Sequence, residues 1–181
     1  MKYWLISDTH FNHDMLVKWG HRPVDFEVTL WEGLYDIPEE DTLIHLGDVC
    51  MGNDAMVHET IKNLRCQKIL IRGNHDKKSV SWYLDHGWDF VMDGMHLEYM
   101  GETLLLTHRP MHPDMWRFTK NIHGHTHGNL HRAEEYINWY ETDFHIDLSP
   151  ELVGYKPQLL GSIIKQYARP KKNRESHKEV V

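Results

Sequence analysis

Metal-binding side chains stand directly after strand-like runs, and this pattern repeats along most of the sequence. Four such segments follow an apolar run rich in β-branched residues, and a fifth follows the shorter stretch 121–123. Packing alone does not explain why strand after strand should end in a histidine or a carboxylate. The pattern predicts a site for more than one metal ion at one edge of a sheet. The segments are Asp8-Thr9-His10, Gly47-Asp48-Val49, Gly73-Asn74-His75-Asp76, Thr107-His108 and Gly124-His125-Thr126-His127.

The composition is that of a folded protein with no membrane partner. The chain has 181 residues, 40% of them hydrophobic and seven of them Trp, which is enough to bury a sizeable core. No stretch approaches the roughly 18 apolar residues of a membrane span, and the amino terminus lacks a secretory signal. The two cysteines, Cys50 and Cys66, form no Cys-x-x-Cys motif. We therefore expect no disulfide framework and a cytoplasmic location.

The charge distribution separates the body of the chain from its end. The formal net charge is −7, so the body offers no electrostatic case for binding nucleic acid. The end of the chain is basic, and we predict a single domain over 1–168 followed by a flexible tail over 169–181. The tail is either a solvated terminus or a polybasic contact for a phosphate-rich partner.

Strand and helix patterns alternate in the first half, which favours βαβ units and a largely parallel sheet. We expect helices over 25–35, from Asn53 or Asp54 onward, and over about 79–86. The apolar face of the second of these helices should contain Met56, Val57, Thr60, Ile61 and Leu64.

The second half is richer in strands. A β-hairpin is expected from His96 to Thr107 around Gly101-Glu102, with further strands near 121–123 and 144–148. Residues 109–118 and 128–142 lack periodicity and are predicted to be loops on the edge that carries the motifs.

The spacing within the motifs suits metal coordination. Residues two apart on an extended segment point to the same side, so Asp8 and His10 can face one ion. His125 and His127 have the same spacing, and Asp48, after a flexible glycine, can bridge two ions. Each residue alone is more typical of a capped turn or a hydrogen-bonded histidine. Five segments with the same chemistry make that explanation poor.

The ordered motifs resemble the calcineurin-like metallophosphoesterase superfamily, over residues 8 to 127. The run from Asp8 to His13, with Arg22-Pro23 after it, looks like the small bacterial and phage phosphoesterases of that superfamily. The resemblance implies an α/β fold in which two mixed β-sheets pack as a sandwich flanked by helices. It also implies a two-metal site at the carboxyl ends of the strands.

Carried over to this sequence, the resemblance implies a ligand set for two divalent ions. The bridging residue would be Asp48, and Mn²⁺ is our first choice of ion, although Fe, Zn²⁺, Ni²⁺, Co²⁺ and Mg²⁺ also suit these ligands. Two ions about 3.5–4 Å apart lower the pKa of a water that they share. The first ion would be held by Asp8, His10, Asp48 and His127, and the second by Asp48, Asn74, His108 and His125.

Two further residues of the motifs are expected to be catalytic. The resemblance implies that His75 faces the substrate and protonates the departing oxygen. Asp76 would hold the His75 imidazole in the right tautomer. Residues outside the ligand set are weighed as substrate contacts: His13 and Arg22, which could instead order their loop, and Arg109, which could instead face solvent.

Other side chains near the motifs are given structural roles. His112 and Trp116 could form a pocket wall, but we favour ordinary surface packing. His45 and His123 are expected in the core or behind the ligands. Thiolate ligation by Cys50 is not expected in a site of oxygen and imidazole ligands.

The sequence thus predicts a binuclear metal-dependent phosphoesterase that hydrolyses a phosphodiester or a phosphomonoester, including nucleotide-like substrates. Little chain is left for a cap domain, so the site should be open. The first alternative is a catalytically silent metal-binding scaffold with an exposed apolar patch from Trp88, Trp116 or Trp139. The second is nucleic-acid processing through the basic tail. The oligomeric state is not predicted.

Overall fold

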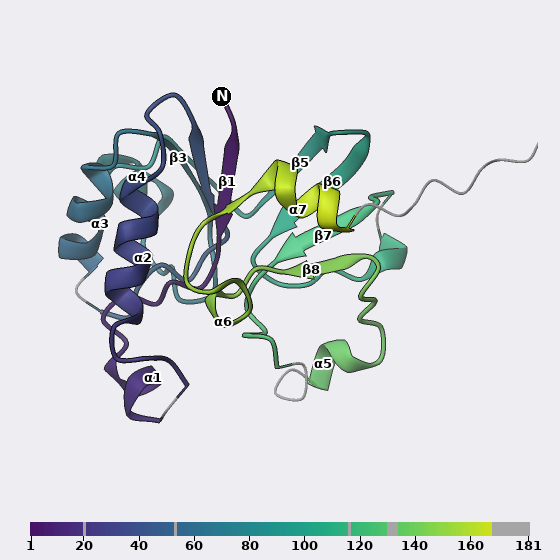
Figure 1. Cartoon of the computed structure of the whole chain (residues 1–181), viewed down its shortest axis with the longest axis horizontal. Coiled ribbons are helices and arrows are strands. Elements are labelled where there is room, and N and C mark those ends of the chain that lie inside the picture. Colours follow the sequence, from purple (N-terminus) through teal and green to yellow (C-terminus); the bar gives the residue numbers. More distant parts are fainter. Residues whose placement is uncertain (20, 53, 116, 130–133, 168–181) are drawn as a thin grey trace, which may run out of the picture.

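The computed structural model describes residues 1–19, 21–52, 54–115, 117–129 and 134–167 (Figure 1). Two mixed β-sheets lie face to face. The first sheet has the order β4-β3-β2-β1-β9, parallel except for β9, and the second has the order β5-β6-β7-β8, parallel except for β5. The strands are β1 (Tyr3–Ile6), β2 (Thr42–His45), β3 (Gln67–Ile71), β4 (Phe90–Met92), β5 (Gly94–Tyr99), β6 (Glu102–Thr107), β7 (Lys120–His123), β8 (His145–Asp147) and β9 (Gln158–Leu159).

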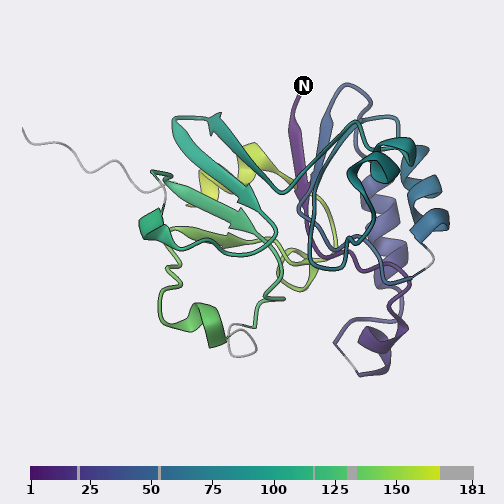
Figure 2. The ribbon, with the colours of Figure 1, turned by 180° about the vertical axis from the view of Figure 1, so that it is seen from behind.

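Helices cover the outer face of the first sheet, as Figures 1 and 2 show for α2, α3 and α4. Further short helices follow the strands of both sheets, and α7 packs its apolar side into the space between them. The helices are α1 (Asp14–Lys18), α2 (Phe26–Tyr35), α3 (Asp54–Lys62), α4 (Val80–Asp85), the 3₁₀ helix η1 (Pro113–Met115), α5 (Glu134–Ile137), α6 (Pro150–Val153) and α7 (Leu160–Tyr167). The predicted sandwich of two mixed sheets flanked by helices is confirmed.

The alternation of side chains along the first sheet produces two cores. Ile6 and Leu43 face the helices, whereas Leu5 and Ile44 face the second sheet. Because successive residues of a strand point to opposite faces, runs that are apolar throughout suit strands buried on both sides. These buried runs fix the strands firmly, and their carboxyl ends are therefore fixed as well.

Most of the expected elements are present. The helices predicted over 25–35 and 79–86 correspond to α2 and α4, and Ser79 Oγ accepts the Trp82 backbone N–H as the cap of α4. The predicted hairpin is the antiparallel pair β5–β6. The regions predicted as loops contain the short η1 and α5. Asn53 and the predicted tail lie outside the described residues.

The apolar face of α3 was predicted in part wrongly. Met56 is 57% exposed, and His58, one turn from Ile61, is buried instead. The His58 ring lies among Trp82, Tyr83 and Trp88, and its Nδ1 accepts the Trp88 indole N–H at 2.9 Å. A hydrogen bond thus allows a polar ring to occupy a place that periodicity assigns to an apolar one. Among the described residues, no helix is both long and apolar enough to cross a membrane.

His58 predicts a loss of stability in acid. Burial lowers the pKa of His58 from 6.5 to about 4. Because the unfolded chain then binds the proton more tightly than the folded one, stability should fall as the pH drops from 6.5 towards 4, by about 2–3 kcal/mol for this residue. Urea unfolding at pH 7 and pH 4.5 measures it. The comparison variant is His58→Gln, which keeps an acceptor for the Trp88 indole N–H but has no ring that titrates. Its loss of stability between pH 7 and pH 4.5 should be smaller than that of the wild type. An identical loss in that variant would exclude His58 as the cause.

Candidate functional site

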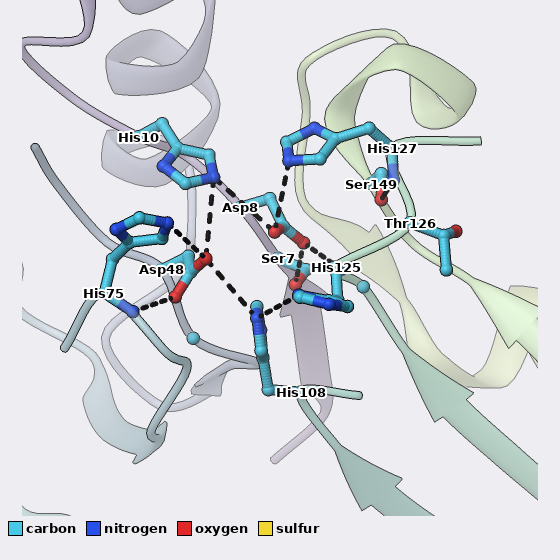
Figure 3. Close-up of polar contacts among 12 residues, drawn as sticks. Ser7, Asp8, His10, Asp48, His75, His108, His125, Thr126, His127 and Ser149 are labelled. Atoms are coloured by element: carbon cyan, nitrogen blue, oxygen red, sulfur yellow. Dashed lines mark hydrogen bonds and ion pairs between the residues drawn. The ribbon is translucent and has the colours of Figure 1, made fainter. Parts of the chain in front are cut away.

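The motif residues converge at the carboxyl ends of strands from both sheets (Figure 3). Asp8 follows β1, Asp48 follows β2, and His75 follows β3. From the second sheet, His108 follows β6, and His125 and His127 follow β7. In Figure 1 this edge lies between α1 and α5, with α6 beneath the sheets. The sequence-predicted ligands are therefore brought together by the two sheets, which approach one another at this edge.

Left-handed backbone conformations are concentrated in these segments. Positive φ angles occur at Asp8 (49°), His10 (47°), Asp48 (56°), His125 (70°) and His127 (50°). Such angles cost a non-glycine residue about 1–2 kcal/mol, and strain of this kind collects at functional sites. The strands end abruptly here, and the turned backbone directs the side chains towards one point.

A first cluster consists of Asp8, His10 and His127, whose ligand atoms lie within 4.8 Å of one another. Asp8 Oδ1 lies 3.7 Å from His10 Nε2 and 3.6 Å from His127 Nε2. These separations are too long for hydrogen bonds. Asp8 Oδ1 is buried and has no hydrogen-bond partner among the described residues. A cation between the three atoms would satisfy an oxygen that is otherwise costly to bury.

A second cluster consists of Asp48, His108 and His125. His108 Nδ1 donates to Leu46 O at 2.8 Å, which leaves Nε2 as an acceptor in the neutral ring. That nitrogen lies 3.1 Å from Asn74 Oδ1, 3.1 Å from His125 Nδ1 and 3.4 Å from Asp48 Oδ2. In the neutral ring, all four of these atoms carry lone pairs and none supplies a proton. Such a group of lone pairs suits a bound cation.

Asp48 lies between the two clusters. Its Oδ2 lies 3.7 Å from His10 Nε2 in the first cluster and 3.4 Å from His108 Nε2 in the second. The donor set of carboxylate, imidazole and amide oxygen fits two divalent ions. The clusters could each hold one metal ion, with Asp48 placed to reach both.

The acidic groups hold a proton on His108 when no ion is bound. Burial alone would lower the pKa of His108, but its hydrogen bond to Asp48 and the charges of Asp8 and Asp48 raise it to about 9. Burial, the neighbouring His108 and Arg109 lower the pKa of His125 to about 4. The pair thus divides into one protonated and one neutral ring, and metal binding must displace the proton from His108.

His75 lies beside the clusters and belongs to neither. Its backbone N–H donates to Asp48 Oδ1 at 2.8 Å, and its ring Nε2 lies 3.9 Å from Asp48 Oδ2. The side chain is 42% exposed, far more than that of His10 or His108. The ring can therefore reach a molecule that enters from solvent.

The contacts of Asp76 differ from the predicted role. Its carboxylate accepts the backbone N–H groups of Asp48 (2.8 Å), Val49 (3.2 Å) and Gly73 (2.7 Å). Among the described residues, no hydrogen bond or ion pair joins it to the His75 ring. Burial raises the pKa of Asp76, although these amides oppose the shift. Asp76 holds the Asp48 loop against the loop after β3, so it positions the Asp48 carboxylate.

Of the three candidate substrate contacts, Arg22 orders its loop, whereas His13 and Arg109 lie close to the clusters. Arg22 is buried and donates to Asp8 O and Thr9 O, which is the loop-ordering alternative. His13 lies beside His10, with ring centroids 5.8 Å apart, and burial lowers its pKa. Arg109 is 51% exposed and lies 3.7 Å from Glu135. It borders a cavity of 270 Å³ together with Asn74 and His108, so it remains close to the site.

The other weighed residues take structural positions. His45 is buried and bonds Thr9 Oγ1 at 2.9 Å, and buried His123 bonds the Tyr140 hydroxyl at 2.9 Å. The Cys50 thiol donates to Asp54, outside both clusters. The His112 ring packs against Trp139 at a tilt of 43°, consistent with surface packing. Trp116 lies outside the described residues.

Three residues that shape the site were missed in the sequence. Asp147, the last residue of β8, accepts hydrogen bonds from Thr126 Oγ1 and Gly128 N and so fixes the loop of His125 and His127. Its place at the end of a strand was a usable signal. Ser7 Oγ donates to Asp8 Oδ2 at 2.5 Å. Glu151 contacts His127 Nδ1 at 3.0 Å from a short helix that carried no signal.

Gly124→Ala should disrupt the first cluster. A Cβ at Gly124 would lie 1.9 Å from Ser7 Oγ and 2.0 Å from Asp8 Oδ2, so Asp8 must move. We expect Mn²⁺ binding to weaken by about 10- to 100-fold, as when a group that supports a ligand is lost. Calorimetric titration measures it. The matched control is Gly94→Ala, whose Cβ meets Thr107 Cγ2 at 3.4 Å. Equal binding by both variants would refute the packing argument.

Comparison with known proteins finds relatives of unknown function and a more distant structure of a phosphodiesterase. No protein-family model matches it. A crystal structure of a protein of unknown function, AQ665 from Aquifex aeolicus, has 29% sequence identity and a TM-score of 0.73, and covers 91% of this chain and 98% of that one. An archaeal phosphodiesterase structure has 21% identity and a TM-score of 0.49 over 83% of each chain, which is too distant to assign an activity.

A further relative was found by comparison of sequences, at a higher identity than either structure. The uncharacterized protein MJ1445 of Methanocaldococcus jannaschii is 32% identical over 178 residues, which cover 91% of this chain and 90% of that protein. This chain belongs to the family of MJ1445.

Proposed function

We propose that the protein is a binuclear metal-dependent phosphoesterase. The observation that carries the proposal is the arrangement of two ligand clusters around Asp48 with an exposed, unclustered His75 beside them. A storage or purely structural metal site has no need of such a histidine. The motifs in their order also resemble the calcineurin-like metallophosphoesterases.

The residues of this chain have distinct roles in the proposal. Asp8, His10 and His127 would hold the first ion, Asn74, His108 and His125 the second, and Asp48 both. When bound, the ions would supply Lewis-acid activation of water and of the phosphoryl oxygens. His75 would deliver its ring proton to the departing oxygen of the ester, as a general acid. Its solvent exposure allows it to be reprotonated between turnovers.

The openness of the site bears on the substrate. The cavity beside Asn74 and His108 lies on one flank, and a second cavity of 430 Å³, lined in part by His125, His127 and His21, lies on another. Space on two flanks suits an ester with a substituent on each side of the phosphorus. We therefore favour a phosphodiester, including cyclic or nucleotide-like ones, over a monoester. Separately, Mn²⁺ is our first choice of ion because it suits a donor set of carboxylate, imidazole and amide oxygen.

A substrate panel tests the proposal. Protein stripped of metal is reloaded separately with Mn²⁺, Fe²⁺, Zn²⁺, Ni²⁺, Co²⁺ or Mg²⁺ and assayed on bis-p-nitrophenyl phosphate, p-nitrophenyl phosphate and cyclic nucleotides. We expect hydrolysis that requires metal and is faster on the diester. Full metal loading with no hydrolysis of any ester would instead favour the scaffold.

The scaffold alternative has less support. Trp88 is buried, so it does not supply the exposed apolar patch that a scaffold was expected to show. The nucleic-acid alternative depends on the tail, which lies outside the described residues. Deletion of residues 170–181 should reduce nucleic-acid affinity in a salt-dependent way if that alternative holds.

A further inference from the structure

Glu151 connects α6 to the first metal-ligand cluster. Its Oε1 lies 3.0 Å from His127 Nδ1 and 2.8 Å from Arg22 Nε. Glu151 and Arg22 are 129 residues apart in sequence, and neither belongs to the predicted ligand set. The two side chains therefore meet through the fold alone, at the back of His127.

The contact fixes which ring nitrogen of His127 carries the proton. A carboxylate paired with Arg22 offers only acceptors, so a 3.0 Å contact requires a proton on His127 Nδ1. Arg22 Nη2 lies 3.5 Å from the same nitrogen, a longer distance than that to Glu151. Arg22 cannot donate to this nitrogen when the nitrogen already bears a proton. Nε2 is then left with its lone pair, and it faces Asp8 Oδ1 at 3.6 Å. This is the tautomer that a metal ion needs.

Arg22 extends the same contact to Asp8. Its Nη1 donates to Thr9 O and its Nη2 to Asp8 O, both at 2.8 Å. These carbonyls belong to the turned segment in which Asp8 has a φ of 49°. One buried pair thus holds the backbone of one ligand and the ring of another.

The cost of this pair argues for a role in the site. The Arg22 side chain is fully buried and that of Glu151 is 18% exposed. A buried ion pair seldom stabilises a fold more than apolar packing would, because both charges must lose their water. Here the polar contacts of the pair are directed at Asp8, Thr9 and His127. Among the described residues, no hydrogen bond or ion pair joins Arg22 or Glu151 to the second cluster.

We propose that Arg22 and Glu151 are a positioning pair for the first metal ion, acting through His127 and Asp8. The inference rests on the metal centre of the proposed function but not on the reaction. It predicts a selective effect. Loss of Glu151 should lower the affinity for one of the two ions and leave the affinity for the other unchanged. Partners behind a metal-ligating histidine typically contribute 10- to 100-fold to affinity.

Calorimetric titration of metal-stripped, full-length protein with Mn²⁺ tests the pair. Glu151→Ala should lower the affinity for one ion by about 10- to 100-fold and leave the affinity for the second ion as in wild type. Glu151→Gln keeps an oxygen that can accept the Nδ1 proton, so its loss should be smaller. The matched control is Glu98→Ala, which removes a carboxylate 3.1 Å from His96 on an exposed strand. It should bind both ions normally.

A double-mutant cycle separates positioning from general damage to the fold. In a His127→Ala background, Glu151→Ala should weaken the first ion much less than it does in wild type, because Glu151 contacts that ring directly and reaches Asp8 only through Arg22. Unchanged binding by Glu151→Ala, or an equal loss at both ions that persists without His127, would overturn the positioning role alone. Failure of the wild-type protein to bind Mn²⁺ would overturn the metal centre and the positioning role together.

Discussion

Replacing His75 with alanine should lower the rate of ester hydrolysis by about 10²- to 10⁴-fold while both metal ions stay bound. The reason is its position: its ring nitrogen lies 3.9 Å from Asp48 Oδ2, yet His75 belongs to neither ligand cluster. The ring is the exposed imidazole beside the two clusters and can donate a proton to a departing oxygen. Its removal should affect turnover more than substrate binding, so kcat falls and KM changes little.

The leaving group provides a second test of the same role. An ester whose leaving group departs without a proton, such as p-nitrophenolate, should be less sensitive to His75→Ala than an alkyl ester. His96→Ala is the control, since this exposed ring pairs with Glu98 outside the site. A His75→Ala protein with full metal content and wild-type kcat on an alkyl ester would refute the acid role.

Replacing Asp48 with asparagine should impair both metal ions together. Asp48 Oδ2 is 3.7 Å from His10 Nε2 and 3.4 Å from His108 Nε2, so its charge serves both clusters. Asparagine keeps the size of the side chain and loses the charge that two cations share. Loss of a group that supports a ligand costs up to roughly 100-fold in metal affinity. Because Asp48 would be a ligand itself, we expect the affinity for each ion to fall by more than this, and the rate of hydrolysis to fall as well.

Titration with Mn²⁺, followed by activity at saturating metal, measures the effect of Asp48→Asn. Asp93→Asn is the matched control, because it makes the same change in a 77% exposed carboxylate that pairs with Arg72. Loss of a single ion would place Asp48 in one cluster and contradict its bridging position. Normal binding of both would remove Asp48 from the ligand set.

The sequence predicted the framework of the site because two local signals coincided. Apolar runs such as Leu43 to Leu46 are buried on both sides of a strand, and the strand must then end where Gly47 and Asp48 begin. The strands meet at one edge, so a ligand after each strand suffices to predict a cluster. Neither step needs knowledge of the long-range contacts.

The residues that were missed depend on such contacts. The role of Arg22 depends on Glu151, which approaches it only after both sheets have formed. Asp76 was assigned to the neighbouring His75 because proximity in sequence was the available guide, but its carboxylate bonds backbone amides across the loop instead. His58 shows the same limit in the core, where one hydrogen bond to Trp88 outweighs helical periodicity.

The proposal that two ions bridged by Asp48 perform hydrolysis is tested most directly by titrating activity against Mn²⁺. Metal-stripped protein at a concentration well above the dissociation constants receives Mn²⁺ in sub-stoichiometric steps, and the rate of bis-p-nitrophenyl phosphate hydrolysis is followed at each step. The rate should stay low until the first equivalent is exceeded and should reach its plateau at two equivalents per chain. A plateau at one equivalent, or two bound ions without hydrolysis, would contradict the binuclear phosphoesterase.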